Sequence, residues 1–147
     1  MAWITITEAD VLTVLSGPEL AAFRTKATAD GQADPLPAVI AQVTDLVRGH
    51  VGICGRNRLG AGATIPGKLL APSLDLIAER LPRRVGLDLT EGRTEAADRA
   101  YRVLEAVARC EFAVEAPESA SAEQTAGPAP QIHARPPQFQ RHDQEGL

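Results

Sequence analysis

LPAVIAQVTDLVRGHVGIC, residues 36–54, is the stretch that decides the fold of this chain. Its apolar residues recur every three or four positions, which is the spacing of one helix face, over about five turns. The Asp34 side chain can accept hydrogen bonds from the first free backbone N–H groups, and Pro35 suits a first helical position. Gly52 and Gly55 mark the end of the helix. The stretch predicts a central amphipathic helix packed under other helices, with this apolar face: Leu36, Val39, Ile40, Val43, Leu46, Val47, Val51 and Cys54.

Two short helices are expected before the central one. The first covers residues 8–16, because Thr7 and Asp10 have the spacing of a capping box. The Gly-Pro pair at 17–18 breaks this helix, and its proline begins a second helix over residues 18–27. The side chains expected to face the core are Val11, Leu12, Val14 and Leu15 from the first helix, and Leu20 and Phe23 from the second.

Two longer helices are expected after the central one. Residues 55–68 have no helical period and predict a long Gly-rich loop. In the fourth helix Pro72 falls in the first turn, so this helix is either kinked there or begins only at Ser73, which could cap it. The fifth helix starts between Thr90 and Thr94. The core stripe is Leu69, Leu70, Leu74, Ile77 and Leu81 in the fourth helix, and Ala97, Ala100, Tyr101, Leu104, Val107 and Ala108 in the fifth.

The outer face of the fifth helix carries acid–base pairs four residues apart, with the acid first. Such pairs stabilise a solvated helix face by a few tenths of a kcal/mol each and mark no site. The three pairs are Glu95 with Arg99, Asp98 with Arg102, and Glu105 with Arg109.

The composition predicts one small helical domain followed by an arm. The 147 residues are 44% hydrophobic but only 3% aromatic, and the net charge of -4 argues against a protein that grips nucleic acid with its whole surface. From Ala116 onward the chain is rich in Pro, Ala, Ser and Gln, which cannot bury enough apolar surface to order alone. We therefore expect an all-α bundle of about five helices over residues 1–114 and an extended arm over residues 115–147.

Membrane and secretory signals are missing from the sequence. There is no apolar run long enough to span a bilayer, and the start MAWITITEAD lacks the basic-then-apolar layout of a signal peptide. The sequence therefore predicts a cytoplasmic chain. Cys54 and Cys110 both fall on predicted apolar helix faces, and in that compartment we expect two buried, reduced thiols rather than a disulfide or a metal site.

The residues with catalytic potential form no recognised set. His50 lies near the apolar edge of the central helix, and no Ser or Cys has a nucleophile's context. GATIPGKL, residues 62–69, matches the G-x4-G-K part of a phosphate-binding loop, but Leu69 replaces the hydroxyl that would hold magnesium and no buried strand precedes Gly62. The loop at residues 30–34, DGQAD, lacks the carboxylate count of a calcium site. We expect neither an enzyme nor a cofactor.

Basic residues indicate where a partner could bind. Arg56, Arg58 and Lys68 lie in a loop without acidic residues, and Arg83 and Arg84 lie at the end of the fourth helix, where they also face its negative dipole end. An alternative is a small DNA-binding regulator in which residues 8–27 form a helix-turn-helix. Its recognition helix would offer only Arg24 and Lys26 for contacts with DNA.

Several segments of the chain together resemble those of one known protein family. WITITEADV near the start resembles that family's opening, an aromatic residue followed by Ile-Thr and an acidic residue before a helix. The order of helices, the loop that closes with Ile65-Pro66, and the segment AYRVLEAVA are also similar. FQRHDQEGL at the end resembles a C-terminal signature of the same family, and it contributes Phe139, Arg141, Gly146 and Leu147. Together these motifs resemble the Mu-like family of phage head–tail connector proteins.

The resemblance implies a structural role in the virion. Family members form a ring, of about twelve copies here, that lies under the portal, extends the DNA channel and docks the next neck or tail protein. The chain would assemble in the host cytoplasm and remain in the neck of the virion. The ring would contact packaged DNA in its lumen without sequence specificity. Phe139 and Leu147 would be the apolar anchors of the arm, and Arg141 its polar anchor.

Overall fold

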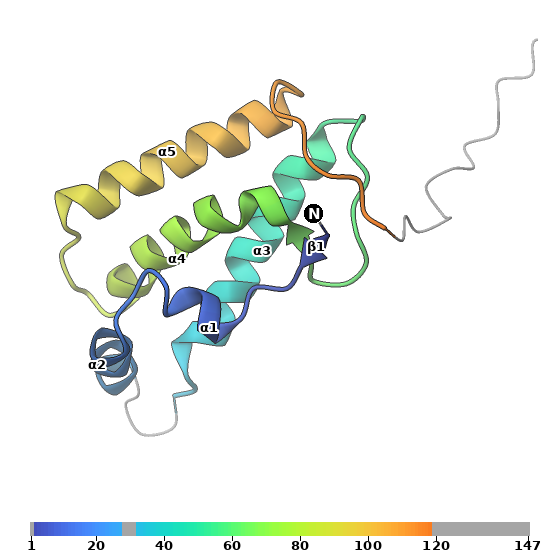
Figure 1. Cartoon of the computed structure of the whole chain (residues 1–147). Helices are drawn as coiled ribbons and strands as arrows, with labels where there is room; N and C mark the ends of the chain where they lie inside the picture. The colour runs from blue at the N-terminus through green and yellow to red at the C-terminus, as the bar shows by residue number, and fades with distance from the viewer. Residues whose placement is uncertain (1, 28–31, 119–147) are drawn as a thin grey trace, which may run out of the picture.

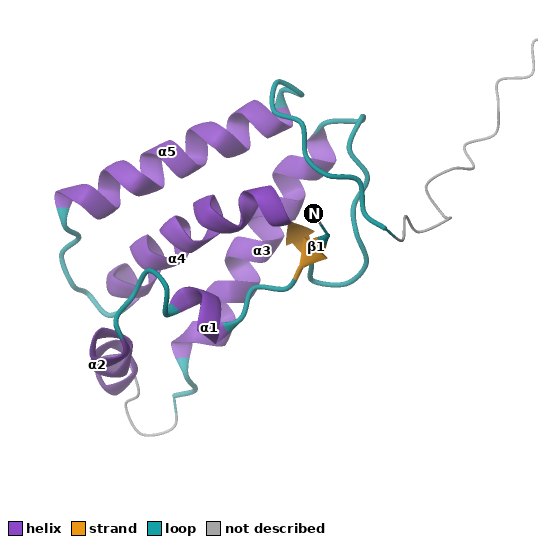
Figure 2. Ribbon diagram, in the orientation of Figure 1, coloured by secondary structure: helices purple, strands orange, loops and turns teal. Residues whose placement is uncertain are grey.

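The computed structural model describes residues 2–27 and 32–118, and within these residues it contains five α-helices. Figures 1 and 2 show the helices packed on one another, with one short strand pair at the edge of the bundle. The predicted all-α bundle is confirmed. The elements are β1 Trp3–Ile4, α1 Glu8–Val11, α2 Gly17–Ala27, α3 Pro35–Ile53, β2 Ile65–Pro66, the 3-10 turn η1 Gly67–Leu69, α4 Leu70–Arg84 and α5 Glu91–Ala108.

The core lies where α3, α4 and α5 meet, with α4 contacting both of the other helices. The central helix begins and ends within one residue of the predicted bounds, and the Leu36 N–H donates to Asp34 Oδ1 at 3.0 Å, as a helix cap requires. Burying one apolar stripe from each of three helices is what stabilises a bundle of this kind. The fully buried side chains include Val43, Val47, Leu76, Ile77, Leu81 and Leu104.

The first helix is shorter than predicted. Its capping box is confirmed, since the Thr7 N–H donates to Asp10 Oδ2 at 2.8 Å, but α1 ends at Val11 rather than at residue 16. Tight turns follow, with the Thr13 hydroxyl donating to the Asp10 carbonyl at 2.6 Å. As a result the predicted inward positions of Leu12 and Val14 are wrong, and these side chains are 44% and 40% exposed.

Helices α2 and α4 also show how prolines set helix ends. Ser16 caps α2, its hydroxyl accepting from the Glu19 N–H at 3.3 Å, so α2 starts beside Pro18 as expected. Pro72 is the third residue of α4, where a backbone N–H would have no partner, and it causes no late start. Ser73 is therefore no cap, and its hydroxyl donates to the Leu69 carbonyl at 2.6 Å.

The exposed face of α5 forms fewer ion pairs than its sequence allows. Glu105 and Arg109 approach to 3.8 Å, whereas the other two predicted pairs form no ion pair in the part of the chain that the structure describes. Arg93, near the start of α5, instead pairs with Glu19 of α2. That contact joins α2 to α5 across 74 residues of sequence.

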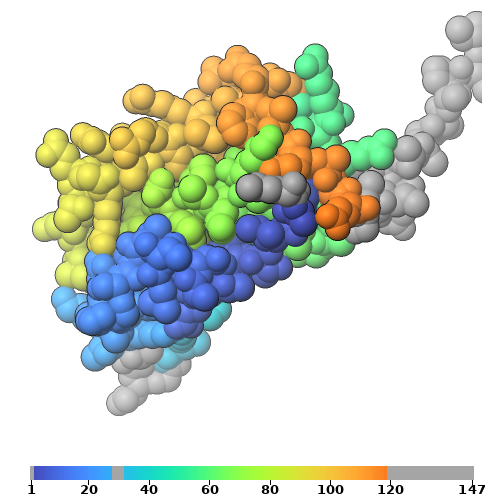
Figure 3. All heavy atoms as spheres, in the orientation of Figure 1, coloured from blue at the N-terminus to red at the C-terminus, as the bar shows by residue number. Residues whose placement is uncertain are grey.

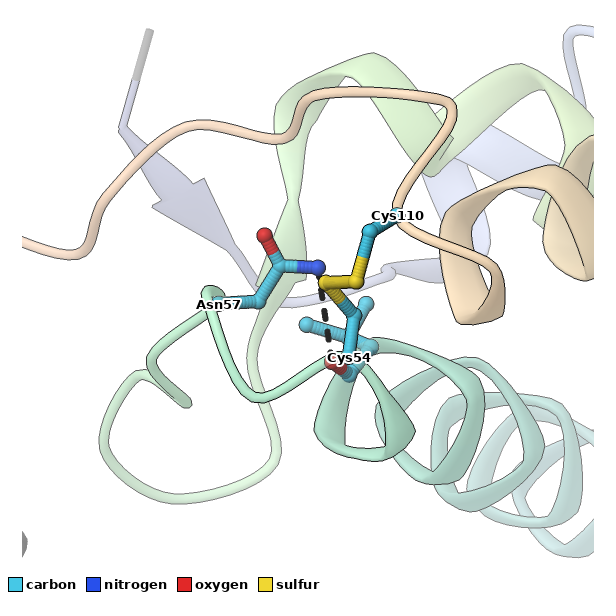
Figure 4. Close-up of a disulfide and its surroundings, with 4 residues drawn as sticks. Cys54, Asn57 and Cys110 are labelled. Carbon is cyan, nitrogen blue, oxygen red and sulfur yellow. Dashed lines mark hydrogen bonds between the residues drawn. A yellow bond between two sulfur atoms is a disulfide. The ribbon is translucent and has the colours of Figure 1, made fainter.

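A disulfide between Cys54 and Cys110 closes one end of the bundle, so the prediction of two reduced thiols is wrong (Figure 4). The two residues are 56 apart in sequence, yet their Cα atoms are 5.4 Å apart. They meet because α3 and α5 end at the same side of the molecule. The Asn57 amide donates to the Val51 carbonyl at 3.4 Å and supports the last turn of α3 beside the sulfur atoms.

Cys110 adopts a backbone conformation that usually belongs to glycine. Its φ is +62°, and it is the one non-glycine residue with positive φ among residues 2–27 and 32–118. The Glu111 N–H donates to the Ala106 carbonyl at 2.9 Å, and the Cys110 N–H donates to the Val107 carbonyl at 3.0 Å. This is the Schellman arrangement, in which the residue after the C-cap is left-handed. The left-handed backbone conformation is therefore strained for any residue other than glycine. A cysteine at this position accepts that strain and forms the disulfide.

This strain gives a first prediction. In a Cys54→Ala background, glycine at position 110 is expected to make the protein more stable than alanine there by about 1 kcal/mol, because glycine adopts positive φ without a steric penalty. Urea unfolding of the two double variants measures the difference. Equal unfolding midpoints would show that the left-handed conformation at residue 110 carries no penalty.

Candidate functional site

Basic side chains gather at the C-terminal end of α4. Arg80, Arg83 and Arg84 line an open hollow between α3 and α4, together with Val39 and Gln42. A second hollow continues from Arg84 to Lys26 and Asp34, near the end of α2 and the start of α3. We call the four basic residues of these hollows the α4 patch: Lys26, Arg80, Arg83 and Arg84.

Two members of the α4 patch are held in place by neighbours. Arg83 Nη1 lies 3.0 Å from Glu79 Oε1, and Glu79 itself is almost fully buried with its other carboxylate oxygen unpaired. Arg80 Nη2 donates to the Tyr101 hydroxyl of α5 at 3.3 Å. Arg83 and Arg84 remain exposed. The patch is therefore positioned by α4 and still open to an anionic partner.

Three further basic residues lie in the segment between α3 and α4. Arg56, Arg58 and Lys68 are exposed, and none of them forms an ion pair with a residue of the described ranges. Lys68 precedes α4 while Arg84 ends it, and a helix of this length separates them by roughly 24 Å at 1.5 Å per residue. We call these three residues the loop patch. Arg83 and Arg84 therefore lie far from Lys68, at the opposite end of α4.

The remaining predicted interface residues, Phe139, Arg141 and Leu147, lie outside the described residues. The expected boundary at residue 115 falls within a segment that packs on the bundle. Residues 109–118 follow α5 back across the molecule, and Phe112 and Val114 pack against the core. This segment fixes the point from which the rest of the chain continues.

Sequence reasoning missed a cluster around Trp3, which we call the Trp3 clamp. The Trp3 indole N–H donates to the Glu115 carbonyl at 2.8 Å, and the Arg48 guanidinium carbon lies 5.9 Å from the centroid of the Trp3 ring. Arg48 also donates to the carbonyls of Thr64 and Gly60, at 2.7 and 3.1 Å. The clamp joins the N-terminal strand, α3, the loop and the segment after α5.

The signal for this clamp in the sequence is weak. Trp3 is the only tryptophan of the chain, and a lone large aromatic in an aromatic-poor protein has to pack somewhere. No spacing rule links it to Glu115, 112 residues away. Both carboxylate oxygens of Glu115 are buried without a hydrogen-bond partner. Burying a carboxylate without a hydrogen-bond partner costs free energy.

In the helix-turn-helix hypothesis α2 would contact DNA, but its Arg24 side chain binds acidic residues of this chain. Arg24 binds Glu8 through both guanidinium Nη atoms at 2.8 Å, and its Nε donates to Asp34 Oδ2 at 3.0 Å. The hydrogen bond from Arg24 lowers the pKa of Glu8. Burial of Asp34 is outweighed by hydrogen bonds from Leu36 and Arg24, so its pKa is also lowered. Arg24 thus joins α1, α2 and the start of α3.

The phosphate-loop-like stretch and His50, both considered above as possible catalytic or binding elements, make contacts within the fold. Ile65 and Pro66, inside the phosphate-loop-like stretch, form the buried strand β2, which pairs antiparallel with β1. The His50 ring is hydrogen-bonded through Nδ1 to the Leu46 carbonyl at 2.8 Å. Asp30 and Gly31 of the DGQAD loop are outside the described residues, whereas Asp34 caps α3. Elsewhere in the described chain, no three His, Cys, Asp or Glu side chains gather closely enough to hold a metal ion.

No family model, no curated protein and no solved structure matches this chain. Of the described helices, none is both long and apolar enough to cross a membrane.

Proposed function

We propose that this chain is a structural adaptor of a phage virion, forming a ring under the portal that extends the DNA channel and docks the next neck or tail protein. The observation that carries the proposal is the anchored segment 109–118. A disulfide, an indole hydrogen bond and two apolar side chains hold it on the bundle, so residues 119–147 start from a fixed point. An arm that binds a neighbouring protein gains affinity from a fixed base, because less orientational freedom is lost on binding.

The charge distribution supports the same proposal. The chain has a net charge of -4, yet exposed basic residues occur both in the α4 patch and in the loop patch between α3 and α4. A ring subunit needs two distinct contact regions, one for a protein partner and one toward the channel. The loop patch suits contact with packaged DNA through phosphates, without reading sequence.

The test is removal of residues 139–147 from the full chain. We expect the truncated protein to fold with unchanged helicity but to lose docking onto purified portal-bearing capsids, because the anchors Phe139, Arg141 and Leu147 are gone. Docking is measured by cosedimentation. Truncated protein that docks as well as the full chain would refute the proposed role of the arm.

A charge-reversal pair separates docking from general charge effects. Arg83→Glu with Arg84→Glu is expected to weaken cosedimentation, since these exposed residues belong to the α4 patch. Arg99→Glu with Arg102→Glu, on the exposed face of α5, changes the net charge equally and is the matched control. Equal loss in both pairs would assign the effect to net charge alone.

A further inference from the structure

The segment that follows α5 is held closed by attachments of different strength. One is covalent, the Cys54–Cys110 disulfide, and another is the hydrogen bond from the Trp3 indole to the Glu115 carbonyl. Phe112 and Val114 pack on the core but remain partly exposed. Figure 3 shows this segment in orange against the dark-blue N-terminal residues. The non-covalent attachments are few, so the disulfide is the main restraint.

One group in the segment opposes closure. Both oxygens of the Glu115 carboxylate are buried without a hydrogen-bond partner, and they would regain water if the segment opened. Cys110 also raises the free energy of the closed segment, because it adopts a left-handed backbone conformation that L-residues disfavour. The closed segment therefore depends on the disulfide more than an ordinary packed loop would.

The helices themselves do not depend on the segment. The buried residues of α5, including Leu104 and Val107, pack against α3 and α4 before Cys110 is reached. Opening the disulfide would leave these contacts in place. Local opening with an intact core is the behaviour expected where one part of a protein has few buried contacts.

We propose that Cys54 and Cys110 form a reversible dithiol–disulfide pair that exchanges with low-molecular-weight thiols of the glutathione type and controls whether residues 110–118 are closed on Trp3. In the oxidised protein the segment is closed, and in the reduced protein it is released and Trp3 is exposed. The proposal uses the same segment as the proposed function, but its test measures only the described bundle and needs no portal or capsid.

The exchange follows ordinary thiol chemistry. A glutathione thiolate attacks Sγ of Cys110, the partly exposed partner, and Cys54 leaves as a thiolate that takes up a proton. A second glutathione thiolate attacks the glutathione sulfur of the mixed disulfide, which releases Cys110 and glutathione disulfide. The Cys110 thiolate then takes up the second proton. Two glutathione molecules are oxidised while one protein disulfide is reduced.

The full chain reports the change directly, because Trp3 is its only tryptophan. In glutathione buffers of falling potential, we expect Trp3 emission to shift to the red and amide exchange in residues 111–118 to rise about tenfold or more, with α3, α4 and α5 protected. Returning to oxidised glutathione should restore both signals. Unchanged emission and exchange after complete reduction, or simultaneous loss of helix protection, would overturn the proposal.

A pair of glutamine substitutions tests the role of the unpaired carboxylate. Glu115→Gln is expected to lower amide exchange of residues 111–118 in the reduced protein, because a neutral amide loses less on burial than a carboxylate. Glu118→Gln is the matched control, since Glu118 is exposed in the same segment. Greater exchange in the Glu115 variant than in the control would contradict this account of the opening.

Discussion

Replacing Cys54 and Cys110 together by alanine is expected to lower the free energy of unfolding by about 4 kcal/mol, the value that loop-closure entropy gives for a disulfide spanning 56 residues. The disulfide restricts the unfolded chain more than the folded one, because the bundle already brings the ends of α3 and α5 together. A large part of a small domain's stability would be lost, although the helices should still form.

Urea unfolding of oxidised wild type and of the double alanine variant measures this loss. Wild type in excess reductant is the matched control, because it removes the bond without deleting sulfur atoms. The two reduced states should have similar unfolding midpoints. A loss below about 1 kcal/mol in both would show that the disulfide contributes little to this fold, against the loop-closure expectation.

The second large effect is expected at Gly60, inside the Trp3 clamp. A Cβ there would lie 2.6 Å from Trp3 Cε3 and 2.7 Å from Trp3 Cδ2, closer than carbon atoms can approach. The ring cannot simply move aside, since Arg48 and the Glu115 carbonyl hold it. We expect Gly60→Ala to lower the free energy of unfolding by about 2 kcal/mol, as overpacking does.

Gly55→Ala is the matched control for this substitution. Gly55 lies in the same loop, a Cβ added to it would meet no heavy atom within 4 Å, and its φ is not positive. Trp3 emission should shift in the Gly60 variant and stay unchanged in the control. Two variants of equal stability and equal emission would mean that the Trp3 ring is not held against Gly60.

The long helices were predictable from the sequence because each carries its own evidence. The apolar period of α3 and its Asp34 cap define the helix without reference to the rest of the chain. The error in α1 arose where two signals competed. The apolar residues at positions 11, 12, 14 and 15 favoured a helix, while the hydrogen bond of Thr13 and the cap at Ser16 favoured turns.

The contacts between distant segments were not predictable. The disulfide and the Trp3 clamp join residues 56 and 112 positions apart, and no periodicity connects them. The compartment argument even favoured reduced cysteines. The sequence pointed to Arg83 and Arg84 by residue type, but the hollows that Arg80, Arg83 and Arg84 line, and the distance from Arg84 to Lys68, depend on how α4 packs and on its length.

The adaptor proposal is tested most directly by the native mass of the purified full chain, measured alone and after mixing with the portal protein of the same phage. The account predicts a portal-bound assembly containing a ring of copies, about twelve if it follows the resemblance. A chain that remains a monomer in the presence of the portal protein, with no complex at any ratio, would contradict it.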